Sequence, residues 1–119
     1  MAWEIEYTNE FEQWWLKLDE ATQNKIAFVV SLLEEKGTNL ESKYSSGING
    51  SRYEHMRELR IQIKGEAYRI LYAFDPRRVA VLLLGGNKGG NDLWYEENIP
   101  KADKLYEELL KELGDEGLI

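Results

Sequence analysis

Alternating apolar and polar side chains predict four β-strands along this chain. From residue 57 to residue 64, every second side chain is apolar, which is the pattern of a strand with one buried face. Residues 68–74 are rich in aromatic and aliphatic side chains, and residues 79–84 form a short, wholly apolar run. A run of that kind suits the central strand of a small sheet, covered on both faces. Residues 2–7 alternate in the same way and predict a short N-terminal strand.

Apolar side chains at helical spacing predict three helices. The first follows Thr8, a plausible N-cap, and the second begins near Asp19 or Glu20 and ends at Gly37. Lysines in both are scattered among acidic residues, so we expect these helices only to pack on the sheet. The last helix is expected to begin near residue 98, with a proline in its first turn, and to end at Gly114.

Two connections show no regular period. Residues 37–56 are rich in Gly, Ser and Asn, and a loop of this length is often functional or mobile. Residues 85–92 are glycine-rich but lack the spacing of a nucleotide-binding loop. The predicted order is therefore βααβββα, an α+β fold with a small, mostly antiparallel sheet, an N-terminal helical hairpin and a C-terminal helix.

Composition limits the classes of function. The chain has 119 residues, and we expect residues 1–119 to form one domain. It contains no cysteine, so disulfides, thiolate catalysis and Cys-ligated zinc are excluded, and we expect no metal or other cofactor. No signal peptide or long apolar run is present, which favours a soluble, cytoplasmic protein that does not associate with membranes. The net charge of −7 argues against a broadly basic surface, so any binding to nucleic acid requires a local basic patch.

Short motifs spread over most of the chain resemble one known protein family. They are Met-Arg-Glu-Leu-Arg at 56–60, Tyr-Arg-Ile-Leu-Tyr at 68–72, the apolar run 79–84, Gly-Gly-Asn-Lys at 85–88, and Trp94-Tyr95 leading into Ile-Pro-Lys-Ala-Asp at 99–103. In these motifs and in the predicted element order the chain resembles the RelE/ParE toxin superfamily, and within it the phage-derived HigB-like toxins of type II toxin–antitoxin systems.

The resemblance implies an activity and partners. Many members of the superfamily cut messenger RNA in the ribosomal A site without a metal ion, whereas the ParE branch poisons DNA gyrase. The implied partners are a cognate antitoxin, commonly a helix-turn-helix repressor, and, for a nuclease, the ribosome and mRNA. We expect the antitoxin to cover the active surface.

Four residues match the family's catalytic positions. Arg69 matches the arginine of the Tyr-Arg strand, and Lys88 matches the basic residue after the last strand. Tyr95 matches the tyrosine that follows, which acts in proton transfer or stacks on a base in the family. Arg60 lies on the preceding strand, where the family keeps basic side chains toward its substrate. A guanidinium group matches phosphate oxygens with its fork of donors, which suits a site that cleaves RNA.

Two of these assignments, Arg69 and Tyr95, have a structural alternative. Arg69 lies in an otherwise apolar strand and is equally suited to a salt bridge with Glu58 or Asp75. An ordinary phenol is a poor base at neutral pH, so Tyr95 would need nearby cations to lower its pKa, or else it only packs beside its neighbours.

Arg57 and His55 are further candidates for substrate binding. By alternation Arg57 and Arg60 point to opposite faces of the strand, and we favour Arg60 because it lies away from the apolar face. His55 lies in a segment where some family members carry a catalytic histidine, although a lone histidine is more often a surface residue.

Three functions remain open from the sequence. The first is a ribosome-dependent mRNA endoribonuclease with Arg60, Arg69, Lys88 and Tyr95 in its site. The second is a toxin that binds gyrase or another protein through its N-terminal helices and C-terminal tail, with Trp14 and Trp15 exposed. The third is an inert relative that keeps the fold and binds its antitoxin, with its basic residues neutralised by acids of the same chain.

Overall fold

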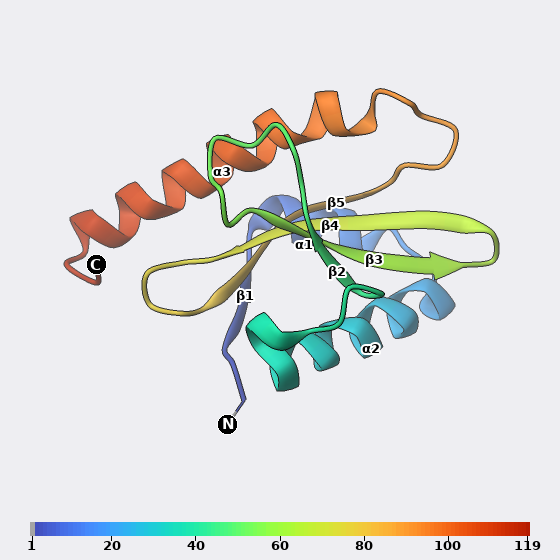
Figure 1. Ribbon diagram of the computed structural model, residues 1–119, viewed down its shortest axis with the longest axis horizontal. Coiled ribbons are helices and arrows are strands. Elements are labelled where there is room, and N and C mark those ends of the chain that lie inside the picture. Colours follow the sequence, from blue (N-terminus) through green and yellow to red (C-terminus); the bar gives the residue numbers. More distant parts are fainter. Residues whose placement is uncertain (1) are drawn as a thin grey trace.

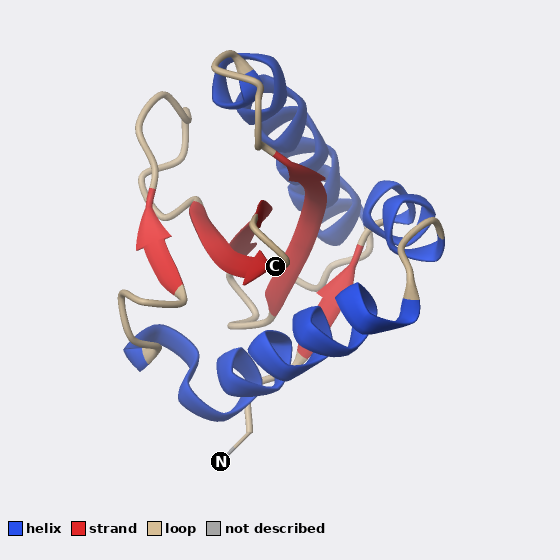
Figure 2. Ribbon diagram, turned by 90° about the vertical axis from the view of Figure 1, so that its right-hand side faces the viewer, coloured by secondary structure: helices blue, strands red, loops and turns tan. Residues whose placement is uncertain are grey.

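One five-stranded sheet separates two layers of helix in the computed structural model, which describes residues 2–119. The sheet has the order β1-β5-β4-β3-β2. Helices α1 and α2 cover one face and α3 covers the other (Figures 1 and 2). The elements are β1 Ile5–Tyr7, α1 Asn9–Leu16, α2 Glu20–Lys36, a 3₁₀ turn at Gly37–Asn39, β2 Ser45–Gly47, β3 Arg57–Ile63, β4 Glu66–Phe74, β5 Ala80–Asn87 and α3 Trp94–Asp115. The predicted α+β class is confirmed.

The sheet is antiparallel except at one edge, where β1 runs parallel to β5. Strand β5 is an inner strand buried on both faces, as predicted, but the middle of the sheet is β4. The prediction of a central position for residues 79–84 was therefore wrong by one strand. The N-terminal strand β1 lies beside β5 at the edge of the sheet. It runs parallel to β5 because the chain crosses over through α1 and α2 before it forms β2 to β5.

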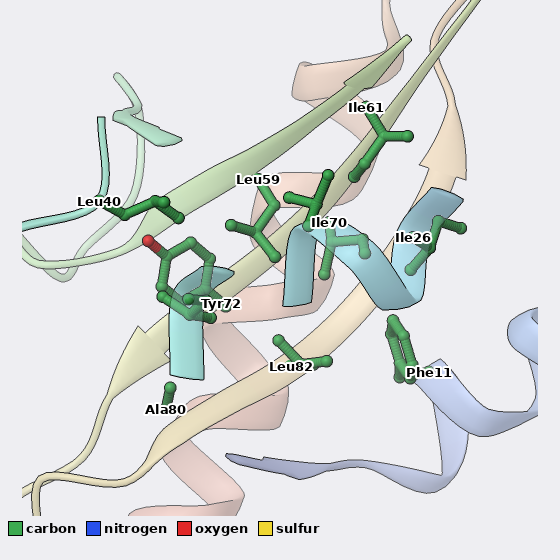
Figure 3. Packing of buried hydrophobic residues seen from close by; sticks show 11 residues of the cluster. Phe11, Ile26, Leu40, Leu59, Ile61, Ile70, Tyr72, Ala80 and Leu82 are labelled. Carbon is green, nitrogen blue, oxygen red and sulfur yellow. The ribbon is translucent and has the colours of Figure 1, made fainter. Parts of the chain in front are cut away.

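The two faces of the sheet carry separate apolar cores. The face beneath α1 and α2 is filled by side chains from β3, β4 and β5 that interlock with both helices (Figure 3). Its buried members are Phe11, Ile26, Val29, Leu33, Leu40, Leu59, Ile61, Ile70, Tyr72, Ala80 and Leu82. The alternate residues of the same strands pack against α3 on the other face. Alternation thus assigns most strand side chains to one core. It is interrupted in β5, where the consecutive residues Leu83 and Leu84 both pack beneath α3 because the register between β4 and β5 shifts at this point.

The ends of the N-terminal helices follow their sequence signals. The Thr8 hydroxyl accepts a hydrogen bond from the backbone N–H of Phe11 at 3.0 Å, and the Asp19 carboxylate accepts one from Thr22 at 2.8 Å. These bonds satisfy backbone donors that the first turn of a helix leaves free. Gly37 ends α2 with φ of 56°, a left-handed conformation that favours glycine.

Two strands differ from the prediction. Strand β2 lies within residues 37–56, where none was expected, because Ser-Ser-Gly carries no apolar alternation and β2 is defined by its pairing with β3. Strand β5 continues through Gly85 and Gly86, which were assigned to a flexible connection. These glycines let the rings of Trp14 and Trp94 lie directly against the strand, one on each face.

Helix α3 begins four residues before the expected start at residue 98 and ends at Asp115 rather than at Gly114. The helix follows a turn at Asn91, whose side-chain oxygen accepts a hydrogen bond from the backbone N–H of Leu93 at 3.0 Å. Pro100 therefore lies inside the helix instead of in its first turn. The missing N–H of the proline frees the carbonyl of Glu96, an exposed residue that water can reach.

The long segment 37–56 is tied to α3. Ser51 donates a hydrogen bond to the Asp103 carboxylate at 2.5 Å, and the backbone N–H of Arg52 donates to the same group at 2.9 Å. Arg52 also reaches Glu107 at 2.8 Å. The segment is therefore held against α3 by two acidic side chains of that helix. Among the helices of residues 2–119, none has the length and apolar character that crossing a bilayer would demand.

Replacement of Gly85 by alanine should destabilise the fold. A Cβ atom at this position would overlap the ring of Trp14, so the helix and the strand would have to move apart. We expect the free energy of unfolding to fall by about 1–3 kcal/mol, the usual cost of overpacking a core. Gly114→Ala is the control, since a Cβ there meets nothing within 4 Å and alanine favours a helix. Urea denaturation of both variants measures the difference, and equal stability for Gly85→Ala and the unmodified chain would contradict it.

Candidate active site

A buried ion pair lies on the face of the sheet beneath α3. Arg69 of β4 is only 6% exposed, and its Nε lies 3.1 Å from Oε1 of Glu58 on β3. The hydroxyl of Tyr95, in the first turn of α3, donates to the same carboxylate oxygen at 2.6 Å and accepts a hydrogen bond from Arg69 Nε at 3.3 Å. Ser46 of β2 donates to the other oxygen at 3.0 Å. The three groups Glu58, Arg69 and Tyr95 are called the Arg69 cluster below.

Strand register explains why these side chains meet. Arg60 and Arg69 are direct cross-strand partners in β3 and β4, so their side chains leave the sheet on the same face. Glu58 lies two residues before Arg60 and therefore shares that face. Two guanidinium groups placed side by side repel, and the Glu58 carboxylate offsets this repulsion for the buried one. The salt bridge considered as the structural alternative for Arg69, with Glu58 or Asp75 as partner, is present and is formed with Glu58. Glu58 is thus a site residue that the sequence identified only as a structural partner.

Lys88 completes the predicted group of four. It follows β5 directly, where its backbone N–H donates to the carbonyl of Ala67 at 2.9 Å. Its ammonium lies 5.9 Å from the centre of the Tyr95 ring. The structure therefore brings together Arg60 of β3, Arg69 of β4, Lys88 at the end of β5 and Tyr95 of α3.

Arg57 and His55 lie elsewhere. Arg57 points to the opposite face of β3, where its Nε donates to the Ser45 hydroxyl at 3.1 Å. His55 Nε2 lies 2.9 Å from the hydroxyl of Tyr106, which is eleven residues beyond Tyr95 on α3, or roughly 16 Å along a helix. Neither residue joins the Arg69 cluster. Arg57 points to the other face of the sheet because of the alternation along β3, and His55 lies beside Tyr106, toward the C-terminal end of α3.

A cationic hollow opens beside the cluster at the edge of β3. It encloses about 230 Å³, and its lining contains four basic side chains and no acidic residue. They are Lys25, Lys43, Arg60 and Arg69. Tyr44 and Gln62 add polar groups. In a chain of net charge −7 this is the local basic patch that binding to nucleic acid requires.

Sequence reasoning missed two of these cations. Lys25 belongs to α2, to which only a packing role was given, and Lys43 lies in the long segment before β2. Neither lysine lies in a sequence motif that would indicate a functional role. They reach the hollow because α2 packs beneath β3, a contact between distant parts of the chain that the local pattern does not contain.

The environment of Tyr95 keeps its phenol protonated. Burial raises the pKa of Tyr95 above its usual value, the hydrogen bond to the Glu58 carboxylate raises it further, and the nearby Arg69 guanidinium opposes both. The nearby cation that the sequence analysis required is Arg69, but its effect on the pKa of Tyr95 is smaller than the combined effect of burial and Glu58. Tyr95 therefore serves at neutral pH as a hydrogen-bond donor, not as a free phenolate base.

Family comparison places the chain among known proteins. A model of the family described as phage-derived protein Gp49-like matches residues 13–107. The chain belongs to this family. The matched residues include the whole Arg69 cluster and the cationic hollow.

The curated relatives of this Gp49-like protein are toxins by name. It is 40% identical over 102 residues to the putative toxin HigB3 of Mycobacterium tuberculosis, covering 85% of this chain and 88% of that one. It is 39% identical over 104 residues to the putative toxin HigB2 of the same organism, of which it covers 52%. The resemblance to HigB-like proteins is confirmed.

Solved structures share the fold. The isolated RelE toxin of E. coli has a TM-score of 0.58 at 13% identity, over 81% of this chain and 95% of that one. RelE in the archaeal RelE–RelB complex of Pyrococcus horikoshii has a TM-score of 0.55 at 15% identity, over 76% and 99%. At such identities the likeness establishes the RelE-like fold.

Removal of the Glu58 carboxylate should destabilise the protein strongly. Glu58→Leu leaves the Arg69 guanidinium buried without its counter-ion, which costs about 3–5 kcal/mol in comparable pairs. The double variant Glu58→Leu/Arg69→Met replaces both charges by apolar groups and should recover most of that loss. Urea denaturation of the three proteins measures this, and a single variant as stable as the unmodified chain would show that the pair contributes nothing.

Stability above pH 10 should depend on Tyr95. Its pKa is higher in the folded than in the unfolded protein, so its contribution is complete below the unfolded value of about 10 and is lost as the pH rises through the folded value. The free energy of unfolding should therefore fall less steeply above pH 10 in Tyr95→Phe than in the unmodified chain. Denaturation curves between pH 8 and 11 compare the two slopes, and parallel curves would contradict the expectation.

Proposed function

We propose that this Gp49-like protein is the toxin of a toxin–antitoxin pair and acts as a metal-independent endoribonuclease on mRNA at the ribosome. The observation that carries the proposal is the cationic hollow, where four basic side chains gather beside the Arg69 cluster in an otherwise acidic chain. A phosphodiester backbone is the ligand that such a hollow fits, because each phosphate carries a negative charge and accepts forked hydrogen bonds from arginine.

Charge stabilisation is assigned to the arginines. Arg60 is exposed and faces the hollow, so it can bind the scissile phosphate directly. Arg69 is held in place by Glu58 and Tyr95, which fixes its guanidinium before substrate arrives. Fixed donors aimed at developing negative charge are the largest single contribution in many enzymes. Lys25 and Lys43 are proposed to hold flanking phosphates.

Proton transfer is assigned to Tyr95, Glu58 and Lys88. As the 2′-oxygen attacks phosphorus, its proton passes to the Tyr95 oxygen while the phenol proton moves along the 2.6 Å hydrogen bond to Glu58. The Lys88 ammonium, beside the Tyr95 ring, gives a proton to the departing 5′-oxygen. The bond from phosphorus to the 5′-oxygen breaks, and the products are a 2′,3′-cyclic phosphate and a 5′-hydroxyl.

The two other functions fit the structure less well. A toxin that acts on gyrase through fully exposed Trp14 and Trp15 is not favoured, because both rings are half-buried and pack with Phe11 in the core beneath α1, which leaves only part of each ring accessible. An inert relative would neutralise its basic residues, yet among the described residues only Arg69 of the four cations in the hollow forms an ion pair.

Induced expression in a bacterial host tests the proposal. Arrest of growth with cuts inside translated codons, detected by primer extension on a reporter message, is the expected result. Arg60→Ala and Lys88→Ala should each reduce cutting by roughly 100-fold, the usual cost of losing one stabilising donor or one catalytic proton donor. Arg60 is exposed and Lys88 is half-buried, so their replacement should leave the fold intact. Replacement of Arg69 would instead leave the buried Glu58 carboxylate without its counter-ion and destabilise the protein.

Lys104→Ala on the exposed face of α3 is the control and should cut as well as the unmodified chain. Arrest of growth without cuts in the message would indicate that the toxin acts on gyrase or another protein instead of mRNA. Absence of arrest, with folded protein accumulated in the cell, would indicate the inert relative.

A further inference from the structure

An apolar groove lies at the opposite edge of the sheet from the cationic hollow. It encloses about 560 Å³ between β1, α1 and α2 and is lined mainly by apolar side chains. Two of them are unusually exposed for their type, Tyr7 at 57% and Leu16 at 64%. Phe11, Trp15 and Val30 form much of the remaining apolar lining. We call this surface the β1 groove.

A second, acidic hollow continues from the β1 groove on the other side of β1. It encloses about 360 Å³ against α3, and Tyr7 lines both spaces. Glu6 lines the hollow and is paired with Arg77 at 2.9 Å. The other glutamates are Glu10, Glu108 and Glu112 in the hollow and Glu12 and Glu34 in the groove. Within residues 2–119, no lysine or arginine lines either space, and apart from Glu6 none of these glutamates forms an ion pair.

The strand between the two spaces is an edge. In the part of the chain that the structure describes, β1 pairs only with β5, so its outer side keeps backbone donors and acceptors for another segment. Apolar pockets, an open strand edge and unpaired carboxylates thus meet within one continuous surface. Such a combination is typical of a surface that binds a peptide segment through apolar anchors and complementary charge.

We propose that the β1 groove and the acidic hollow bind a basic, amphipathic segment of a partner protein, with apolar side chains in the groove and lysine or arginine against the glutamates. A second copy of this chain is disfavoured, because it would place the same glutamates against one another. Only the choice of that partner as the antitoxin rests on the proposed function; the surface does not depend on it.

The position of this surface has a consequence for the site. Strand β1 is three strands away from β3 in the sheet, which is roughly 14 Å between the strand axes. A segment bound along β1 therefore leaves the cationic hollow open. This differs from the expectation that an antitoxin covers the active surface.

Binding of the product of the gene adjacent to this chain's own gene tests the proposal. Calorimetry on the two purified proteins should show binding that weakens as salt is raised, because opposite charges meet. Leu16→Glu should reduce the affinity about tenfold or more, as for an apolar anchor at the centre of an interface. Leu93→Glu, at a leucine that is 54% exposed outside the groove, should bind like the unmodified chain.

Reversal of the charge of two groove glutamates tests the electrostatic part of the proposal independently. Glu12→Lys/Glu34→Lys should weaken binding roughly tenfold and remove most of its salt dependence. Glu41→Lys/Glu54→Lys changes the net charge equally at exposed positions away from the groove, and should have little effect. Circular dichroism of each variant confirms that it is folded.

The alternatives give different results. No binding, or unchanged binding in both groove variants, overturns the proposal. A dimer of this chain alone that Leu16→Glu dissociates would assign the groove to a second copy. A complex that no longer binds single-stranded RNA would place the partner over the hollow instead. Because binding is measured without any cleavage, partner binding without nuclease activity defeats only the proposed function, and cutting without partner binding defeats only this inference.

Discussion

The buried pair of Arg69 and Glu58 is the constraint on which the site depends. A guanidinium at 6% exposure is tolerated only with a counter-ion and satisfied hydrogen bonds. The carboxylate that meets this need also accepts hydrogen bonds from Ser46 of β2 and Tyr95 of α3. One ion pair on β3 and β4 therefore ties the edge strand and the C-terminal helix to the middle of the sheet.

This arrangement divides the basic residues into two kinds. Arg69 is rigid because its Nε is already shared between Glu58 and Tyr95. Its guanidinium therefore offers a phosphate well-oriented donors, while the Glu58 carboxylate offsets part of its positive charge. Arg60, Lys25 and Lys43 form no ion pair with any described residue, and their charge is available to a ligand. A fixed donor surrounded by free cations combines preorganisation with charge attraction, which is what stabilisation of a transition state on phosphate requires.

The sequence predicted those parts of the structure that local patterns determine. Helix ends at Thr8, Asp19 and Gly37 follow from cap chemistry, and the separation of Arg57 from Arg60 follows from alternation. Strand β2 could not be predicted, since it exists through pairing with β3 and not through its own residues. Lys25 and Lys43 were missed for the same reason: a helix and a loop bring them to the hollow, and nothing in their neighbourhood along the chain indicates it.

The distribution of charge bears on how a substrate reaches the site. At physiological salt, charges are screened beyond about 8 Å, so the cationic hollow attracts phosphate only at short range. Outside the hollow, the acidic surface of a chain of net charge −7 repels phosphate over the same short range. Free RNA in solution should therefore associate slowly, whereas RNA already held in place close to the hollow avoids that barrier. The proposed action on mRNA held by a ribosome is consistent with this distribution of charge, because such a substrate is presented by a larger assembly.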